Sequence, residues 1–187
     1  MNNSIDLTNH LLIAMPGLND ENFRHTVTYV CEHDNQGAMG IIINRPSGLR
    51  LGDILDQLDI PADSAQDIDQ IIYTGGPVQN ERGFVLHTND SEWDSTLPIT
   101  AATSITTSRD ILEAIAHGQG PEKSLIALGY AGWAEGQLEE ELRSNSWLNG
   151  PAEEQIIFDL PSDHRWQAAA LALGVDINLL SGDAGHA

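Results

Sequence analysis

The chain of 187 residues is poor in positive charge. It has 8 lysine and arginine residues against 28 aspartate and glutamate residues, which gives a formal net charge of −20 with the histidines neutral. Its one lysine is Lys123. Proteins that bind DNA or RNA draw much of their affinity from basic side chains that neutralise phosphates. We therefore expect no direct binding to nucleic acid.

Long apolar runs and cysteine pairs are also missing. No stretch approaches the ~20 apolar residues that a membrane-spanning helix needs. The apolar stretch 11–15 is shorter than the roughly 7–15 residues of a signal-peptide core, and no basic leader precedes it. The single cysteine, Cys31, cannot form an internal disulfide. A cytoplasmic protein without membrane contact is the expectation.

The short motifs of several enzyme and metal-binding classes are absent. There is no GxGxxG before a helix, no GxSxG and no HExxH. The stretch GQGPEKS resembles a phosphate-binding loop in outer spacing, but Glu122 stands where a glycine must precede Lys123, and a helix precedes it rather than follows it. Cys31 and His33 could share a strand face, yet zinc takes three or four protein ligands. We expect no metal and no cofactor.

The length suits one domain, which buries roughly 70% of the surface that the unfolded chain exposes. Residues 1–9 are expected to form a flexible N-terminal tail, residues 10–180 the domain, and residues 181–187 a C-terminal tail. Alternating and helical apolar periodicities predict the elements. The predicted strands are 10–15, 26–33, 38–43, 70–74, 83–87, 97–99, 104–107, 124–130 and 155–160, and the predicted helices are 51–58, 109–117, 135–145 and 162–173.

Strands outnumber helices in this pattern, and several strands follow one another directly. A repeating βαβ order is therefore excluded, and a mixed sheet in an α+β domain is favoured. Gly75-Gly76-Pro77 breaks the chain between two of the strands. The two glycines can adopt conformations that a Cβ forbids, and the proline fixes its own φ, so a sharp change of direction is predicted there.

Polar residues at strand ends beside glycine or proline are the candidates for a ligand pocket. They are Asn44, Arg45, Gly75, Gly76, Pro77, Arg82, His87, Ser108, Arg109, Tyr130 and Trp133. If the sheet brings these ends together, the three arginines would hold an anion and His87, with an ordinary pKa near ~6.5, would act as a general acid and base. Alternatively, the arginines pair with the many carboxylates and the glycines serve backbone geometry alone.

Several stretches, taken in order, are similar to one known family. LLIAMPGL, QGAMGIIINRP, YTGGPV with RGFVLH, TTSRD, LGYAGW with QLEEEL, NSW and the terminal AGHA resemble the AlgH/YqgE family of small bacterial proteins. The resemblance runs from residue 11 to 187. It implies a single α+β domain with a bifurcated, mixed β-sheet that forms a pseudo-barrel flanked by helices. It also implies a role in regulating transcription, including exopolysaccharide genes in some relatives, and brings no catalytic residues with it.

Three functions remain open from the sequence. The first is a cytosolic regulator of gene expression that acts indirectly, through an unknown protein partner or a small ligand. The second is an enzyme or binder for a small anionic or phosphorylated metabolite at the arginine-lined pocket. The third is a scaffold without a ligand. An enzyme is less favoured than a binding protein, and a monomer or weak dimer is expected.

Overall fold

The computed structural model describes residues 5–62 and 68–180 of the chain. The C-terminal tail predicted at residues 181–187 lies outside these described residues. In chain order the elements are β1 (His10–Ala14), β2 (Val27–Asp34), β3 (Gly37–Ile42), β4 (Pro46–Arg50), α1 (Leu51–Gln57), β5 (Ile71–Thr74), β6 (Val78–Thr88), β7 (Thr96–Pro98), β8 (Thr103–Thr106), α2 (Arg109–Ala116), β9 (Ser124–Ala134), α3 (Gln137–Arg143), β10 (Trp147–Pro151), η1 (Gln155–Asp159), η2 (Ser162–His164), α4 (Arg165–Leu171) and η3 (Ile177–Leu180).

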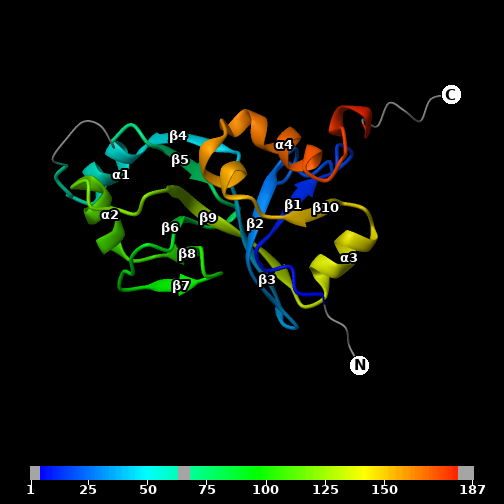
Figure 1. Ribbon diagram of the computed structural model, residues 1–187, viewed down its shortest axis with the longest axis horizontal. Coiled ribbons are helices and arrows are strands. Elements are labelled where there is room, and N and C mark those ends of the chain that lie inside the picture. The colour runs from blue at the N-terminus through cyan, green and yellow to red at the C-terminus, as the bar shows by residue number, and fades with distance from the viewer. Residues whose placement is uncertain (1–4, 63–67, 181–187) are drawn as a thin grey trace.

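The strands form a single curled sheet, a half-barrel with helices packed around it (Figure 1). Their order is β10-β1-β2-β3-β9-β6-β8-β7, and β5 joins the sheet at β9 and carries β4. β5 runs parallel to β9, whereas the other pairings in the described part of the chain are antiparallel. The sheet is therefore mixed, and the predicted single α+β domain is confirmed.

The sheet divides at β9. Near the start of this strand, Ile126 pairs with Ile72 of β5 on one side and with Val85 of β6 on the other. From Ala131 to Ala134 the strand pairs instead with β3. Between these two stretches Gly129 has φ +79°, a left-handed conformation that glycine adopts without a steric penalty. β9 thus belongs to both arms of a bifurcated sheet.

Gly75 connects the two arms through its own backbone. Its N–H donates a hydrogen bond to the carbonyl of Leu128 in β9 at 2.8 Å, and its carbonyl accepts one from the N–H of Ile42 in β3 at 2.8 Å. The backbones approach so closely here that a Cβ at Gly76 would overlap the carbonyl group of Tyr130. A change of direction was predicted at Gly75-Gly76-Pro77. Here the chain leaves β5, crosses β9 and begins β6 on the other side of β9.

Two apolar cores lie on opposite sides of this branch. The main core fills the curled sheet under η1 and α4, where Tyr29, Ile41 and Ala170 are each 0% exposed. The second core lies beneath α1 and α2, and it buries Leu51 and Ile111 completely. The helices are thus held to the sheet by the apolar stripes that their periodicity predicts.

The N-terminal segment expected to be part of a tail is packed against the domain from Leu7 onward, whereas Ile5 is 70% exposed. Leu7 is 2% exposed and packs with Leu138 and Trp147 in a third apolar cluster. The N–H of Asn9 donates to the carbonyl of Val30 at 2.8 Å. A single apolar residue among polar neighbours has no periodicity, so the sequence pattern contains no signal for this packing.

Several predictions of elements are wrong. β6 begins at Val78, whereas the predicted strand begins at residue 83. The stretch 155–160 is the helical turn η1 rather than a strand, because two adjacent buried residues, Ile156 and Ile157, fit either structure. β9 continues through Ala131-Gly132-Trp133, where a break was predicted. β4 and β10 were missed because glycine and proline within them disfavour strands, although proline is tolerated in a strand at a sheet edge such as β10.

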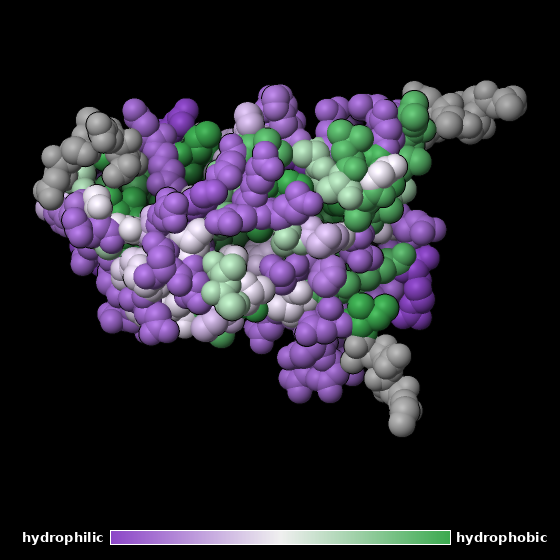
Figure 2. Space-filling model, in the orientation of Figure 1, coloured by the Kyte–Doolittle hydropathy of each residue, from purple (hydrophilic) through white to green (hydrophobic). Residues whose placement is uncertain are grey.

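The outer surface reflects the composition. Hydrophilic residues dominate the face drawn in Figure 2, and hydrophobic ones gather near the C-terminal helical segment, where Leu171 and Leu179 are 61% and 77% exposed. No helix within the described ranges is both long and apolar enough to cross a membrane.

Replacing Gly76 with alanine tests the crossing at the branch. The new Cβ overlaps backbone atoms of β9, which cannot rotate away as a side chain can, so we expect a loss of about 3 kcal/mol in the free energy of unfolding. Gly83→Ala is the matched control, because nothing lies within 4 Å of a Cβ at that position. Urea unfolding followed by circular dichroism measures both. Equal stability of the two variants would contradict the crossing.

Candidate functional site

Arg45 and Asn44 are used to hold the connection between β3 and β4. The Arg45 guanidinium donates to the carbonyls of Asn22 and Arg24, the latter at 3.1 Å. The Asn44 side chain accepts the first N–H of β2 at 2.8 Å and donates to a carbonyl of the preceding loop at 2.9 Å. Both side chains are therefore engaged by backbone groups.

The other two candidate arginines lie elsewhere. Arg82 donates to the side chain of Gln79 at 3.2 Å, and its guanidinium carbon lies 5.3 Å from the ring centroid of Phe84. Arg109 pairs with Glu113 one turn along α2 at 2.9 Å. Arg82 and Arg109 line two different cavities, and Arg45 lines neither. The structure does not bring the three arginines together into one anion pocket.

His87 is buried in β6 with 0% of its surface exposed. Its Nδ1 lies 2.8 Å from the carbonyl of Thr88, which can only accept, so Nδ1 carries a proton. Nε2 is then free to accept from the Thr106 hydroxyl at 2.7 Å. Burial lowers the pKa of His87, while the Thr88 carbonyl and the nearby Asp90 carboxylate act against that shift. The net lowering of the pKa, caused by burial, favours a neutral ring.

A hydroxyl in contact with an imidazole is the starting arrangement of a nucleophile and its base. Thr106 and His87, however, both have 0% of their surface exposed, and the second ring nitrogen of His87 binds a backbone carbonyl rather than a carboxylate. The pair links β6 to β8, and neither side chain is exposed to solvent.

The remaining candidates divide between packing and cavity walls. Gly75, Gly76 and Pro77 occupy the branch of the sheet described above. Tyr130 meets Phe84 edge to face at 5.6 Å. The indole N–H of Trp133 donates to Glu141 of α3 at 2.7 Å, which fastens that helix to β9.

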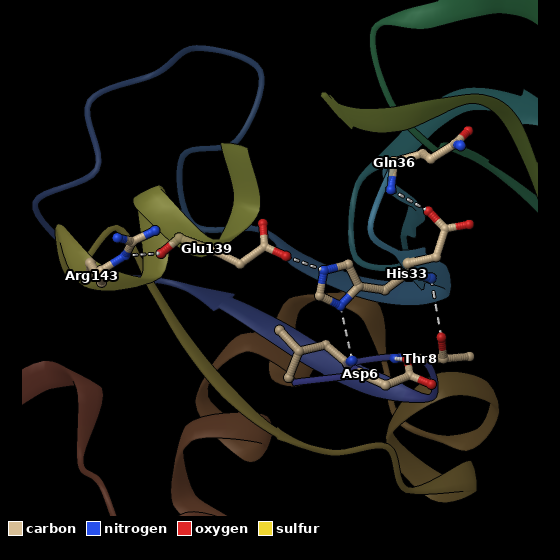
Figure 3. Close-up of polar contacts among 8 residues, drawn as sticks. Asp6, Thr8, His33, Gln36, Glu139 and Arg143 are labelled. Carbon is tan, nitrogen blue, oxygen red and sulfur yellow. Dashed lines mark hydrogen bonds and ion pairs between the residues drawn. The ribbon is translucent and has the colours of Figure 1, made fainter. Parts of the chain in front are cut away.

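His33 joins three parts of the chain (Figure 3). Its Nδ1 accepts the N–H of Leu7 at 3.0 Å, and its Nε2 lies 2.7 Å from a carboxylate oxygen of Glu139 on α3.

Burial raises the pKa of the Cys31 thiol above its usual range. Over residues 5–62 and 68–180, no three or more histidine, cysteine, aspartate or glutamate side chains gather where they could hold a metal ion.

The feature best suited to a ligand is a cleft between α1 and α2, called here the α1–α2 cleft. Its volume is about 500 Å³, within the roughly 300–1,000 Å³ typical of ligand pockets. Val85, Ile126 and Leu128 from β6 and β9 form an apolar floor, and Leu58 and Leu112 line the cleft from the two helices.

Polar groups line one part of the same cleft. They are Gln57 near the end of α1, Asn80 and Glu81 of β6, Thr106 at the end of β8 with Thr107 after it, and Ser108 and Arg109 at the start of α2. Ser108 does not cap its helix: its hydroxyl donates to Asp110 at 2.5 Å and accepts the N–H of Ser95 at 3.0 Å. Of the predicted candidates, only Ser108 and Arg109 line this cleft.

The apolar walls of the cleft were missed from the sequence. Leu58 and Leu112 lie in the predicted helices 51–58 and 109–117, whose apolar stripes predict contact with a core. Nothing in their spacing indicates that two helices stand apart over the same sheet. A signal would have required the register of β6 against β9, which brings Val85 beside Ile126.

The geometry defines a class: a small α+β protein whose bifurcated half-barrel carries a ligand-sized cleft. The chain belongs to the AlgH-like family (DUF179), whose sequence profile matches residues 11–178. This confirms the family resemblance inferred from the motifs.

Named relatives agree over the full length of the chain. A UPF0301 protein of Thioalkalivibrio sulfidiphilus is 56% identical over 100% of both chains, and one of Saccharophagus degradans is 54% identical over 98% of this chain and 90% of its own. The solution structure of the AlgH protein from Pseudomonas aeruginosa, 54% identical, covers 100% of both chains with a TM-score of 0.80. A Corynebacterium diphtheriae protein, 18% identical over 97% of this chain and 94% of its own, shares the fold with a TM-score of 0.75.

The buried His87 predicts a specific pH dependence. Because its pKa is lowered in the folded protein, the unfolded chain binds the proton more readily, and stability falls as the pH drops below the ordinary value of ~6.5. Between about pH 7.5 and about pH 5.5, the native protein should lose more unfolding free energy than His87→Asn, by at most about 1.4 kcal/mol per pH unit.

Urea titrations at the two pH values measure this difference. His164→Asn is the control, because His164 has a side chain 66% exposed and its replacement should leave the native slope unchanged. An identical pH dependence for the native protein and His87→Asn would show that the histidine does not titrate with folding.

Proposed function

We propose that this protein is a binding module that influences gene expression indirectly, through a small ligand held in the α1–α2 cleft. The observation that carries the proposal is the cleft itself: a cavity of about 500 Å³ with an apolar floor and polar groups along one part. Small-molecule sites are concave and mostly apolar, with a few polar groups that fix orientation. The regulatory role follows the family resemblance.

The lining indicates the kind of ligand. Val85, Ile126 and Leu128 would bury an apolar body, because apolar surface removed from water stabilises the complex by roughly 25 cal/mol per Å². Glu81 and Arg109 carry opposite charges at the rim, and Arg109 already pairs with Glu113. These features favour a ligand with a neutral, hydrogen-bonding end over an anion.

The net charge supports an indirect route to gene expression. A protein with a charge of −20 repels the phosphates of a duplex, and the basic residues described are spread over several elements rather than gathered along one groove. An effect on transcription would then pass through the ligand or through a second protein.

The alternative of an enzyme for an anionic metabolite is less well supported. It needs Arg45, Arg82 and Arg109 to converge, and it needs His87 to reach the substrate. The arginines lie in three places, and His87 has 0% of its surface exposed. The binding proposal requires no such movement of the structure.

A thermal-shift screen of neutral apolar metabolites tests the cleft. A ligand present at about a hundred times its Kd stabilises the folded state by about 2.7 kcal/mol, which raises Tm by roughly 5–11 °C in a domain of this size. Gly83→Val should abolish that rise: the new side chain projects from β6 on the same face as Val85, into space with nothing within 4 Å.

Gly17→Val is the matched control, since its Cβ also meets nothing within 4 Å and the residue does not line the cleft. It should keep the ligand-induced rise. A ligand that stabilises Gly83→Val as strongly as the native protein binds elsewhere, and a screen without any stabilising compound would contradict the proposal.

Fluorescence anisotropy with a labelled random-sequence DNA duplex tests the indirect route. We expect no tight binding even at low salt, where electrostatic attraction to phosphate is strongest. Lysozyme, a basic protein, serves as a positive control for nonspecific binding. Tight binding that weakens steeply with added salt would show direct contact with DNA and overturn this part of the proposal.

A further inference from the structure

A second cavity, of about 640 Å³, lies between the β2–β3 hairpin and the start of β6, alongside the end of β9. We call it the β6–β9 groove. It shares no lining residue with the α1–α2 cleft. Three of the residues singled out in the sequence, Arg82, Tyr130 and Trp133, line it. The function proposed above does not use them.

One wall of the groove is a strand edge. The pairing of β6 with β9 ends at Val78 and Tyr130, and β3 pairs with the following stretch from the opposite side. On the β6 side, therefore, no strand of the described chain pairs with β9 from Ala131 to Ala134. Gly132, in the middle of this stretch, is exposed and lines the groove without a side chain to cover its backbone. The N–H of Ala134, at the end of the stretch, already donates to the side chain of Gln137 at 3.0 Å. The edge from Ala131 to Trp133 can accept a further strand.

The floor of the groove is apolar and aromatic. Phe84 is 4% exposed and meets Tyr130 edge to face, and Met39 of β3 lies beside them. The guanidinium of Arg82 already lies over the Phe84 ring at 5.3 Å from its centroid. The floor thus accommodates apolar side chains and the stems of cationic ones.

The opposite rim of the groove is acidic. Glu32 and Asp34 project from β2, are both exposed, and make no ion pair with any residue in the described part of the chain. Asp34 accepts the N–H of Gln36 in its own turn, at 2.8 Å. Arg82, on the β6 side, is the positive group facing them. Two unpaired carboxylates on a chain of charge −20 select a cationic occupant.

We propose that the β6–β9 groove binds an extended, lysine-containing or arginine-containing segment of a partner protein, which adds as a strand to the edge of β9 at Ala131–Trp133. Backbone hydrogen bonds to this edge give affinity, and alternate side chains of the segment enter the aromatic floor. Its basic side chains lie toward Glu32 and Asp34. The inference goes beyond the ligand cleft and stands or falls separately from it, because the two cavities share no lining residue.

The test uses the full chain and short fluorescein-labelled peptides. One peptide alternates lysine and valine, and a second alternates glutamate and valine. A third is the lysine peptide with alternate backbone amides N-methylated, which removes the donors that a strand must supply. Fluorescence anisotropy should detect binding of the first peptide alone, because the glutamate peptide meets the acidic rim and the N-methylated peptide cannot pair with β9.

The variant Glu32→Gln/Asp34→Asn tests the rim. Both replacements keep the shape of the side chain, and the amide that replaces the Asp34 carboxylate keeps an oxygen for the turn, so folding should be preserved as judged by circular dichroism. We expect affinity for the lysine peptide to fall about fivefold, the combined effect of two exposed ion pairs. Glu21→Gln/Glu92→Gln removes the same charge away from the groove and should leave the affinity unchanged.

Several outcomes would overturn the proposal. They are absence of binding by the lysine peptide, equal binding of the N-methylated or glutamate peptide, and an equal loss of affinity in the two double variants. Sedimentation velocity tests whether a second copy of the chain occupies the groove. If the chain self-associates and Glu32→Gln/Asp34→Asn changes that association, the occupant is a second copy, and the proposal of a partner protein is overturned. Failure of the ligand screen with success of the peptide test would leave this inference intact.

Discussion

The close approach of backbones at the branch of the sheet is the constraint on which the rest of the structure depends. β9 exchanges one neighbour for another at Gly129, and the chain leaving β5 passes directly over it. Gly75 hydrogen-bonds both arms, and a side chain at Gly76 would leave no room for β9. Without this crossing the two arms would have to form separate sheets with an unpaired edge each.

The two cavities follow from the same branch. One arm carries α1 and α2 over β6 and β9, which places the α1–α2 cleft on its outer side. The other arm takes β3 to the far end of β9 and leaves the opposite edge of that strand open. A strand that serves two arms is paired on both sides only over part of its length, and the proposed partner segment would complete the pairing where β6 ends.

Local sequence patterns predicted most of the helices and strands, but not which of them lie next to one another in the fold. The alternation in Thr26–His33 and the helical spacing around Leu51 are features of single elements, and both agree with the structure. The two-sided pairing of Ile126 and the strand at Trp147–Pro151 depend on residues far away in the chain. The arginines show the same limit: Arg82 lies within β6 rather than at the start of a strand, and only tertiary pairing decides whether the three arginines converge.

The long-range pairing of β9 also orders events during synthesis. Its partners β3, β5 and β6 all precede it in the chain. Within the described residues, β9 is the strand that joins β3 of one arm to β5 and β6 of the other. Neither arm can complete its hydrogen bonding until residue 134 has left the ribosome. Until then the apolar faces of the earlier hairpins remain uncovered, a condition that favours aggregation over folding in proteins with long-range strand pairing.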